Sequence, residues 1–258
     1  MAKHALVTGA TSGIGHGIAV KLMKEGYHVS VNGLIASEAL EPLLLELQGH
    51  GPGKVRFADA DLRAASAIES MMKEAAKEFG PIDVLVNNAG IQHVSPVEDF
   101  DPAKWDAIIA INLSSAFHTT RLAVPAMKKA GWGRIVNLAS AHGLVASPFK
   151  SAYVSAKHGV LGLTKTVALE LAKFGITCNS VCPGYVKTPL VEAQIPDTAK
   201  ARGMTEQEVI EKVLLAAQPT GQFVSIEQVA DTVAFLLTDG AANITGTSIS
   251  IDGGWTAQ

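Results

Sequence analysis

The sequence predicts an α/β protein with a doubly wound parallel sheet and helices on both of its faces. Seven short apolar runs alternate with longer amphipathic stretches along the chain. Most of these runs are apolar at nearly every position, which indicates strands that are covered on both faces. Strict alternation of strands and helices is typical of right-handed βαβ units in one sheet. A length of 258 residues is compatible with a single such domain.

The individual elements follow from hydrophobic period and turn residues. Strands that end in turn residues are expected within 4–9, 27–33, 54–61, 82–90, 133–140, 175–184 and 247–254. Helical periodicity runs over about 14–25, 36–48, 64–79, 101–130, 151–174 and 226–238. Neither an internal repeat nor a low-complexity linker divides the chain, so residues 1–258 are expected to form one domain.

A long insertion breaks this alternation between the sixth strand and the last helix. The segment, about residues 187–218, exceeds an ordinary connection and therefore indicates a functional element. Its apolar residues predict two short amphipathic helices, punctuated by Pro189, Pro196 and Gly203. We interpret the segment as a lid over the active site, with an oligomer contact as the alternative.

Composition excludes several classes of function. The net charge is −3, and the basic residues are scattered, so no footprint for nucleic acid or an anionic membrane is visible. No leader or membrane-spanning stretch is recognisable, so a cytoplasmic location is expected. Cys178 and Cys182 are interpreted as small buried hydrophobes. No His, Asp or Glu set has convincing metal-ligand spacing, so no metal is expected.

The first strand runs into a glycine-rich turn, Thr8-Gly9-Ala10-Thr11-Ser12-Gly13-Ile14-Gly15. Glycines allow a sharp turn and a close approach of the backbone to a pyrophosphate. The helix that follows offers unpaired N–H groups and the positive end of its dipole. A glycine cluster between a first strand and a helix is the context that dinucleotide binding requires. The sequence thus predicts a Rossmann-type, dinucleotide-binding and catalytic domain.

The end of the second strand indicates which dinucleotide is bound. Asn32 stands where NAD-binding folds usually have an acidic residue for the ribose 2′-hydroxyl. Neither Thr11, Ser12 nor Leu34 supplies the cation that a 2′-phosphate needs. The absence of a cation that could bind a 2′-phosphate favours NAD over NADP. Asp61, at the end of the third strand, is a candidate acceptor for the adenine amino group.

Three separate segments contribute a catalytic constellation. Tyr153 and Lys157 share one face of a predicted helix, Ser140 ends an apolar strand, and Asn112 lies in a helical segment. Proton transfer at neutral pH needs a phenol whose pKa lies below about 10, and a neighbouring ammonium group favours the phenolate. A serine hydroxyl can hold the substrate oxygen, and an amide oxygen can support a water that relays protons to the lysine.

These motifs, with Asn87-Asn88-Ala89-Gly90, occur in an order that resembles the short-chain dehydrogenase/reductase family over nearly the whole chain. The resemblance implies that Asn112, Ser140, Tyr153 and Lys157 form a catalytic tetrad. It also places Pro183, Gly184, Val186 and Thr188 beside the nicotinamide. The expected cofactor-binding set is Gly9, Thr11, Ser12, Gly13, Ile14, Gly15, Asn32, Asp61, Leu62, Asn88, Ala89, Gly90, Tyr153, Lys157, Pro183, Gly184, Val186 and Thr188.

Further segments resemble a bacterial subgroup of this family that oxidises D-3-hydroxybutyrate, among them NNAGIQH, ASAHGLVAS, KSAYVSAKHGV and DGGWTA. That resemblance implies that Gln92, His142, Lys150 and Gln194 bind the substrate carboxylate. Tyr185 stands where the subgroup usually has Trp, which implies a smaller and more polar pocket wall. The expected reaction is the reversible, NAD-dependent oxidation of D-3-hydroxybutyrate to acetoacetate.

Two alternative functions compete with this one. An NADPH-dependent 3-ketoacyl reductase would need a cation for the 2′-phosphate and a basic surface for an acidic carrier, and neither is visible. A non-catalytic dinucleotide-binding protein would not need a complete tetrad.

A homotetramer is expected, mainly from the family resemblance. Helices 101–130 and 151–174 carry apolar residues on several faces, which calls for additional cover. These residues include Ile108, Ile109, Phe117, Val160, Leu161 and Leu163. The C-terminal segment with Trp255 is expected at a second subunit contact.

Overall fold

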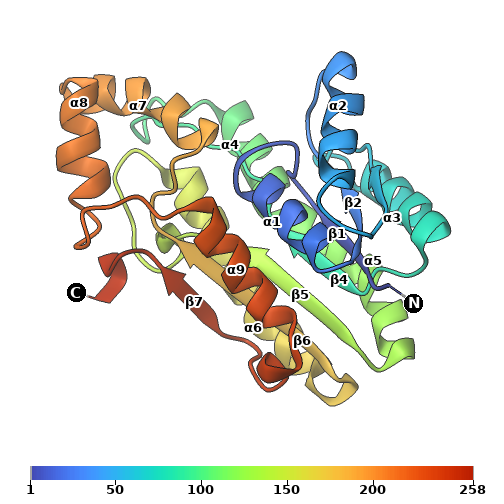
Figure 1. Ribbon diagram of the computed structural model, residues 1–258. Coiled ribbons are helices and arrows are strands. Elements are labelled where there is room, and N and C mark those ends of the chain that lie inside the picture. Colours follow the sequence, from blue (N-terminus) through green and yellow to red (C-terminus); the bar gives the residue numbers. More distant parts are fainter. Residues whose placement is uncertain (1, 258) are drawn as a thin grey trace.

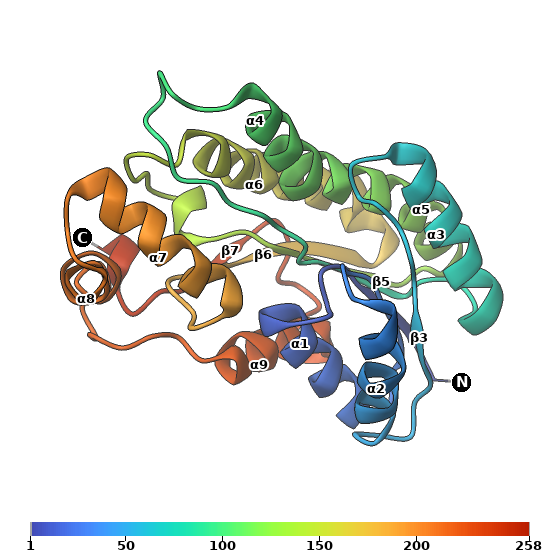
Figure 2. The same cartoon turned by 90° about the horizontal axis from the view of Figure 1, so that it is seen from above.

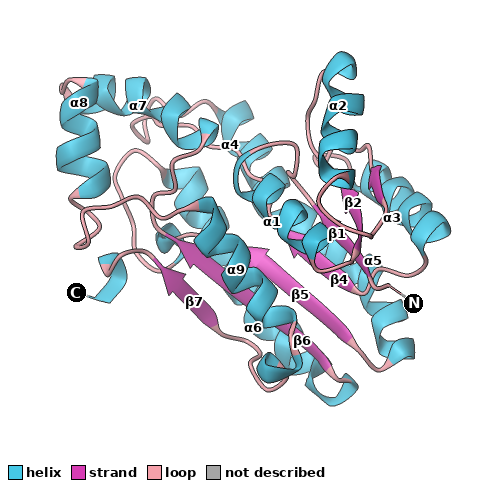
Figure 3. Cartoon of the chain, in the orientation of Figure 1, coloured by secondary structure: helices cyan, strands magenta, loops and turns pink. Residues whose placement is uncertain are grey.

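A computed structural model of the chain describes residues 2–257. Its centre is a seven-stranded parallel sheet with the strand order β3-β2-β1-β4-β5-β6-β7 (Figures 1 and 3). All seven expected strands are confirmed, with the bounds β1 His4–Val7, β2 His28–Val31, β3 Val55–Phe57, β4 Val84–Asn87, β5 Gly133–Leu138, β6 Ile176–Pro183 and β7 Ser248–Ile251. The inner strands β1, β4, β5 and β6 are buried along their whole length, as their continuous apolar runs predict.

Helices cover both faces of this sheet, which confirms the doubly wound arrangement (Figure 2). One face carries α1 (Gly13–Lys24), α2 (Ser37–Gln48) and α9 (Ile226–Leu237). The opposite face carries α3 (Ala65–Phe79), α4 (Pro102–Ile109), α5 (Ser115–Ala130) and α6 (Ser151–Leu171). Each layer buries its own apolar cluster against the sheet, so the two faces have separate cores.

The strand order fixes where a ligand can bind. The chain runs outward from β1 to β3 and then returns to place β4 on the other side of β1. Crossovers therefore leave β1 and β4 toward opposite faces, and a crevice opens beyond their carboxyl ends. The turns after β1, β4, β5 and β6 all lie at this edge, and they carry the motifs that the sequence singles out.

The expected helix over 101–130 contains a feature that the sequence did not reveal. A π-helical turn, Ala110–Ser114, separates α4 from α5. Asn112 lies inside this turn and is buried. Wide π-helical turns occur frequently at functional sites, because the extra residue redirects one side chain.

The insertion contains the two helices predicted for it. Thr188 caps the first, α7 (Pro189–Arg202), and Gly203 ends it in a left-handed conformation with a φ of 62°. The second begins as α8 (Glu206–Val209) and continues as a π-helical segment, Ile210–Leu215. A reciprocal capping box between Thr205 and Glu208 fixes its start. The pair packs around its own apolar cluster, at the carboxyl end of the sheet (Figure 2).

Cys178 and Cys182 are buried and are not joined to each other, and burial raises the pKa of their thiols to about 12 and about 11. Within residues 2–257, no helix is both long and apolar enough to cross a bilayer. The same residues contain no group of three acidic, His or Cys side chains placed to hold a metal ion.

Candidate active site

The glycine-rich turn between β1 and α1 forms a close-fitting backbone cradle. Gly9 and Gly13 have φ angles of 63° and 56°, which only glycine adopts without strain. A Cβ atom on Gly9 would lie 2.7 Å from the Ala89 Cα atom, and one on Gly15 would overlap the Gly9 carbonyl oxygen. Ser12, the N-cap of α1, makes no side-chain capping bond. The first-turn N–H groups are therefore free of a side-chain cap, which fits a pyrophosphate at this helix terminus.

The turns after β1 and β4 are joined by a compact set of hydrogen bonds. The Thr8 hydroxyl accepts from the backbone N–H groups of Asn88 and Ala89, both at 3.0 Å. The Asn88 side-chain amide donates to the carbonyls of Thr8 and Gly9, both at 2.9 Å. The Asn88 side chain thus binds the backbone of the glycine-rich turn. The expected cofactor-binding residues Asn88, Ala89 and Gly90 lie next to this turn.

The turn after β6 closes the other side of the cradle. Pro183 ends β6, and Val186 is buried and forms an isolated bridge with Val224. A Cβ atom on Gly13 would lie 3.5 Å from the Thr188 side chain, so the cap of α7 lies directly against the glycine turn. The start of the insertion therefore adjoins the proposed cofactor cradle.

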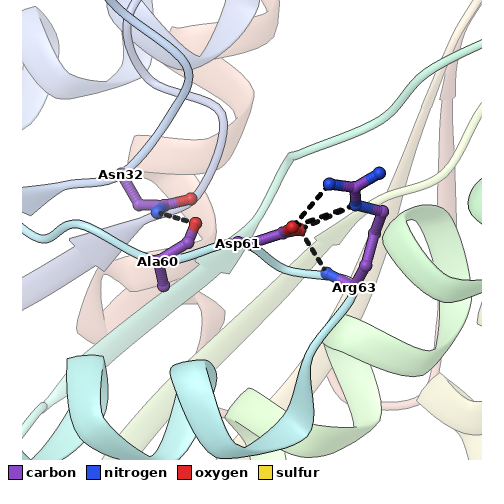
Figure 4. A network of polar contacts seen from close by, with 4 residues as sticks. All are labelled: Asn32, Ala60, Asp61 and Arg63. Carbon is purple, nitrogen blue, oxygen red and sulfur yellow. Dashed lines mark hydrogen bonds and ion pairs between the residues drawn. The ribbon is translucent and has the colours of Figure 1, made fainter.

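Asn32 is fully buried and is bound to neighbouring backbone rather than presented at the surface. Its side-chain amide donates to the carbonyls of Ala58 at 2.9 Å and Ala60 at 3.2 Å, which ties β2 to the segment after β3 (Figure 4). Leu34 follows with a 92% exposed side chain, and its carbonyl accepts from the Thr11 hydroxyl at 3.0 Å. Asn32 therefore shapes this end of the cradle without adding a charge to it.

Asp61 is paired with Arg63, a cation that the sequence analysis did not consider. The guanidinium donates to both carboxylate oxygens, and the Arg63 N–H donates to one of them at 2.9 Å (Figure 4). These bonds hold the pKa of Asp61 at about 2. Leu62, between them, buries its side chain in the core beneath α3, so only its backbone is available to a ligand.

The structure brings the four expected catalytic side chains to the same edge of the sheet. Ser140 follows β5 and caps a short 3₁₀ turn, where its hydroxyl accepts from the His142 N–H at 3.1 Å. Tyr153 and Lys157 lie one turn apart on α6, and the Lys157 Nζ atom is 5.5 Å from the centre of the Tyr153 ring. Lys157 also donates to the Leu138 carbonyl at 2.6 Å, at the end of β5.

Asn112 binds the backbone beyond β4 with both ends of its amide. Its oxygen accepts from the Ile91 N–H and its nitrogen donates to the Ile91 carbonyl, each at 2.9 Å. The π-helical turn is therefore fastened to the segment that leads from Gly90 to Gln92. A π-helical turn leaves no clear hydrophobic signature, so only the family pattern pointed to this residue.

The pKa of Tyr153 departs from the expected direction. Burial raises the pKa of the Tyr153 phenol to about 12, and a hydrogen bond with Ser140 offsets only part of this effect. Burial also lowers the pKa of Lys157 to about 8. Burial therefore outweighs the lowering of the Tyr153 pKa that was expected from a neighbouring ammonium group, while Lys157, with a pKa of about 8, remains mostly charged at neutral pH.

A second buried lysine lies next to this constellation. Lys150 begins α6 and donates to the Tyr185 hydroxyl at 3.3 Å and to the Gln194 side-chain oxygen at 3.0 Å. Gln194, from α7, also accepts from the Gln92 amide. Among residues 2–257, Lys150 has no carboxylate partner. Burial lowers the pKa of Lys150 to about 7, and the nearby Arg202 acts in the same direction.

Aromatic rings complete the pocket around His142. The imidazole meets the edges or faces of Tyr153, Tyr185 and Trp255, with ring centres 6.0, 6.1 and 4.9 Å away. The Tyr185 and Trp255 rings are stacked, 5.2 Å apart and 13° from parallel. Burial is the largest reason that the pKa of His142 falls to about 3. The imidazole is therefore neutral at physiological pH, and its Nε2 atom lies 3.0 Å from the Ser147 hydroxyl.

Trp255 is a pocket residue that sequence reasoning did not assign to the site. Its ring lies against Tyr185 and His142, and the subunit contact expected for its segment stays a prediction. The distance of 70 residues between Tyr185 and Trp255 hides this contact from any local pattern. His93 and His158 lie outside the constellation: His93 packs on Phe100, and His158 is exposed and bonds to the Val154 carbonyl.

Comparison with known proteins agrees with this geometry. Residues 3–199 match the family model for short chain dehydrogenases. The chain belongs to this family of oxidoreductases, whose Rossmann fold binds a nicotinamide dinucleotide.

Several relatives match the chain over nearly its full length. The D-beta-hydroxybutyrate dehydrogenase of Rhizobium meliloti (strain 1021) is 57% identical over 258 residues, with 100% of both chains covered. The protein of the same name from Cupriavidus necator is 51% identical, covering 99% of this chain and 98% of the relative. A solved structure of a variant actinorhodin polyketide ketoreductase with NADPH superimposes with a TM-score of 0.93 at 36% identity, covering 100% and 98% of the two chains.

Gly15 offers a direct test of the cofactor cradle. Gly15→Ala places a methyl group against the Gly9 carbonyl oxygen and the Asn88 amide, so NADH affinity is expected to fall by at least about tenfold. Gly162→Ala in α6 is the matched control, because a Cβ atom there meets nothing within 4 Å. Fluorescence titration with NADH measures both variants. Unchanged affinity in a folded Gly15→Ala protein would contradict the cradle.

Proposed function

We propose that this protein catalyses the reversible, NAD-dependent oxidation of D-3-hydroxybutyrate to acetoacetate. The observation that carries this proposal is Lys150, a buried cation without a carboxylate partner among the described residues. It contacts Tyr185, whose ring packs on His142, and the His142 ring packs in turn on Tyr153. A buried charge of this kind is stable only with a compensating partner, which an anionic substrate can supply. Two relatives named D-beta-hydroxybutyrate dehydrogenase, at 57% and 51% identity, support the same substrate.

Ser140 and Tyr153 are proposed to act on the carbinol oxygen. The Ser140 hydroxyl holds this oxygen, and the Tyr153 phenolate accepts its proton as the carbonyl forms. A bound nicotinamide dinucleotide supplies the acceptor for the hydride that leaves the carbinol carbon. In the reverse direction Tyr153 returns the proton to the ketone oxygen.

Lys157 and Asn112 are proposed to supply and remove that proton. With a pKa of about 8, Lys157 exchanges protons readily near neutral pH, whereas the Tyr153 phenol with a pKa of about 12 does not. When charged, the Lys157 ammonium favours the Tyr153 phenolate, 5.5 Å from the ring centre. Asn112 fastens the Gly90–Gln92 segment and is placed to support a water on the path to Lys157.

The substrate carboxylate is proposed to bind at Lys150, with Gln92, Gln194 and His142 around it. A carboxylate can take the place of the Gln194 oxygen as acceptor for Lys150, and a charged acceptor makes the stronger bond. Gln194 lies on α7, so substrate binding and the position of the insertion are coupled. We propose that residues 187–218 act as a lid that excludes water from the reacting atoms.

NAD is proposed as the cofactor for two reasons. The end of β2 offers no cation of its own, since Leu34 is exposed there and Asn32 is bound to backbone carbonyls. Arg63, a cation on the segment after β3, is already neutralised by Asp61. A doubly charged 2′-phosphate would therefore lack a partner.

A 3-ketoacyl reductase is the second candidate. A 3-oxoacyl-[acyl-carrier-protein] reductase of Staphylococcus aureus is 38% identical, covering 98% of both chains. A carrier-linked thioester has no carboxylate, so Lys150 would remain an unpaired buried cation. The carboxylate pocket thus favours the free hydroxy acid.

A homotetramer is proposed from the apolar residues that the chain leaves exposed on one layer. Ile108, Val160 and Leu161 are covered within the chain, but Phe117 and Leu169 remain exposed on α5 and α6. Both helices belong to the same face of the sheet (Figure 2), where a second chain can cover them. The cytoplasmic location expected from the sequence stays a prediction, and the two unpaired cysteines are compatible with it.

The chemistry is tested by replacing the proposed proton acceptor. Tyr153→Phe keeps the ring and is expected to keep NAD affinity, but turnover should fall roughly 10²–10⁴-fold. Formation of reduced nicotinamide from D-3-hydroxybutyrate and NAD measures turnover. Tyr27→Phe, at a half-buried tyrosine remote from the site, is the control. Retention of a tenth of wild-type activity by Tyr153→Phe would remove Tyr153 from this role.

Lys150 predicts how pH separates charged from uncharged substrates. Because the Lys150 pKa is lowered to about 7, its ammonium is present below that pH and is lost above it. The ratio of kcat/KM for 3-hydroxybutyrate to kcat/KM for its methyl ester should therefore fall by up to about tenfold per pH unit above pH 7. Lys150→Met should lower this ratio by roughly ten- to a hundredfold and flatten its pH profile. An equal loss for acid and ester would contradict the carboxylate pocket.

Cofactor choice is tested at Leu34. Leu34→Arg places a cation beside the Asn32 turn and should raise the preference for NADP over NAD by roughly ten- to a hundredfold. Leu45→Arg, on exposed α2, is the control and should leave the preference unchanged. Comparable use of NADP and NAD by the wild type would show that this interpretation is wrong.

The assembly is tested by light scattering of the purified protein, which should give the mass of four chains at micromolar concentration. Leu169→Glu introduces a charge at an 82% exposed position on α6 and should produce smaller species. Leu45→Glu, at a 66% exposed position on α2, should leave the mass unchanged. A wild-type monomer would rule out the tetramer.

A further inference from the structure

Gln218 is a buried polar residue at the end of the insertion that the proposed chemistry does not use. Its side chain is 1% exposed. The side-chain oxygen accepts from the Tyr185 backbone N–H, and the side-chain nitrogen donates to the Gln222 carbonyl. Both ends of the amide are thus hydrogen-bonded. The oxygen binds the backbone of Tyr185, whose ring lines the pocket.

The same side chain lies against the turns that carry both stacked rings. A Cβ atom on Gly184, just before Tyr185, would overlap the Gln218 side-chain oxygen. A Cβ atom on Gly253, two residues before Trp255, would lie 3.2 Å from the Gln218 Cβ atom. The Gln218 amide therefore requires glycine at position 184, whereas Gly253 packs against the Thr220 hydroxyl and the Gln218 Cβ atom. Gln218 consequently touches the backbone beneath Tyr185 and the backbone beneath Trp255.

The backbone brings the two turns together at their start, where the Gly184 N–H donates to the Ile251 carbonyl at 2.9 Å. The Tyr185 carbonyl accepts from the Val224 N–H at 2.9 Å, and the Trp255 N–H donates to the Asp252 carbonyl at 3.2 Å. The Tyr185 N–H, by contrast, is bound by the Gln218 side chain. Loss of the Gln218 amide would leave the buried Tyr185 N–H unpaired, so the turn would shift to find another acceptor.

The stacked rings lie where the alkyl end of a hydroxy acid would meet the pocket wall. Lys150, the proposed carboxylate partner, reaches the Tyr185 hydroxyl, while the Tyr185 ring face is covered by Trp255. His142 packs against both rings from the side of Ser140. The alkyl end of a hydroxy acid that is bound by these groups is proposed to face the two rings.

We propose that Gln218 is a positioning residue that fixes Tyr185 and Trp255 as a rigid wall, and thereby excludes 3-hydroxy acids longer than four carbons. The proposal rests on the proposed function, because it concerns the chain length of that substrate. Rigidity matters because the two rings exclude extra methylene groups only if a longer substrate cannot displace them.

The test compares two acids with each variant. Gln218→Leu keeps a branched side chain of similar size but removes the amide, and Gln207→Leu makes the same change at an exposed residue of the insertion. With NAD, the ratio of kcat/KM for D-3-hydroxybutyrate to that for D-3-hydroxyhexanoate should fall at least about tenfold in Gln218→Leu. It should stay within twofold of wild type in Gln207→Leu. The shift should appear mainly as a higher KM for the shorter acid and a lower KM for the longer one.

A ratio within twofold of wild type in Gln218→Leu, whether overall activity is kept or lost, overturns the proposal. If that variant does not fold, Gly184→Ala displaces the same amide from the other side and should lower the same ratio. Cofactor effects cancel in the ratio, because both acids use the same bound cofactor.

Near-ultraviolet circular dichroism tests the positioning without activity. The difference between the spectra of wild type and Trp255→Phe gives the signal of the Tyr185–Trp255 stack. The Gln218→Leu variant should lose most of this signal. A preserved signal would overturn the role of Gln218. Wild-type protein that oxidises neither acid would instead contradict the proposed function, and this spectrum would still decide whether Gln218 orders the rings.

Discussion

The hydrogen bonds between Thr8 and the Asn88–Ala89 backbone are the interaction on which the rest of the site depends. They join the turn after β1 to the turn after β4, the two strands between which the sheet reverses its order. Gly9 can approach Ala89 closely only because it has no side chain. From Gly90 the chain passes directly to Ile91, which Asn112 holds with two hydrogen bonds. One continuous network therefore leads from the proposed cofactor cradle to the π-helical turn that carries Asn112, one of the proposed catalytic residues.

Burial of positive charge is the second constraint on this pocket. Lys150 and Lys157 are both buried, and each is bound by neutral oxygen acceptors rather than by a carboxylate. Desolvation lowers the pKa of both amines, to about 7 and about 8. At neutral pH Lys150 is thus partly protonated and Lys157 mostly protonated, and a bound anion would favour the charged form of either amine. This arrangement gives Lys150 a preference for anionic ligands and allows Lys157 to exchange protons at neutral pH.

The sequence was sufficient for the sheet and for the helices to within a few residues, because each element is a strongly apolar run or has one apolar face. The proposed tetrad rests on the family pattern as well, since nothing in the hydrophobic pattern marks Asn112. The sequence was not sufficient for features that depend on long-range contacts or on how deeply a side chain is buried. The π-helical turn at Asn112 and the packing of Trp255 on Tyr185 leave no local pattern. The Asp61–Arg63 pair is local in sequence, but whether two such side chains meet depends on the turn that holds them. The pKa of Tyr153 was expected to fall, yet burial raises it, and burial is a property of the assembled core.

The insertion explains why cofactor and substrate sites can respond to each other. Near its start, Thr188 packs against Gly13 of the cradle. Six residues further along α7, Gln194 contacts Lys150 and Gln92. α7 is one helix, capped at Thr188 and ended at Gly203, and it spans from the glycine turn to the proposed carboxylate pocket. A movement of the whole helix that admits the proposed hydroxy acid would therefore also move its cap relative to Gly13, and this contact is the structural link between the two proposed sites.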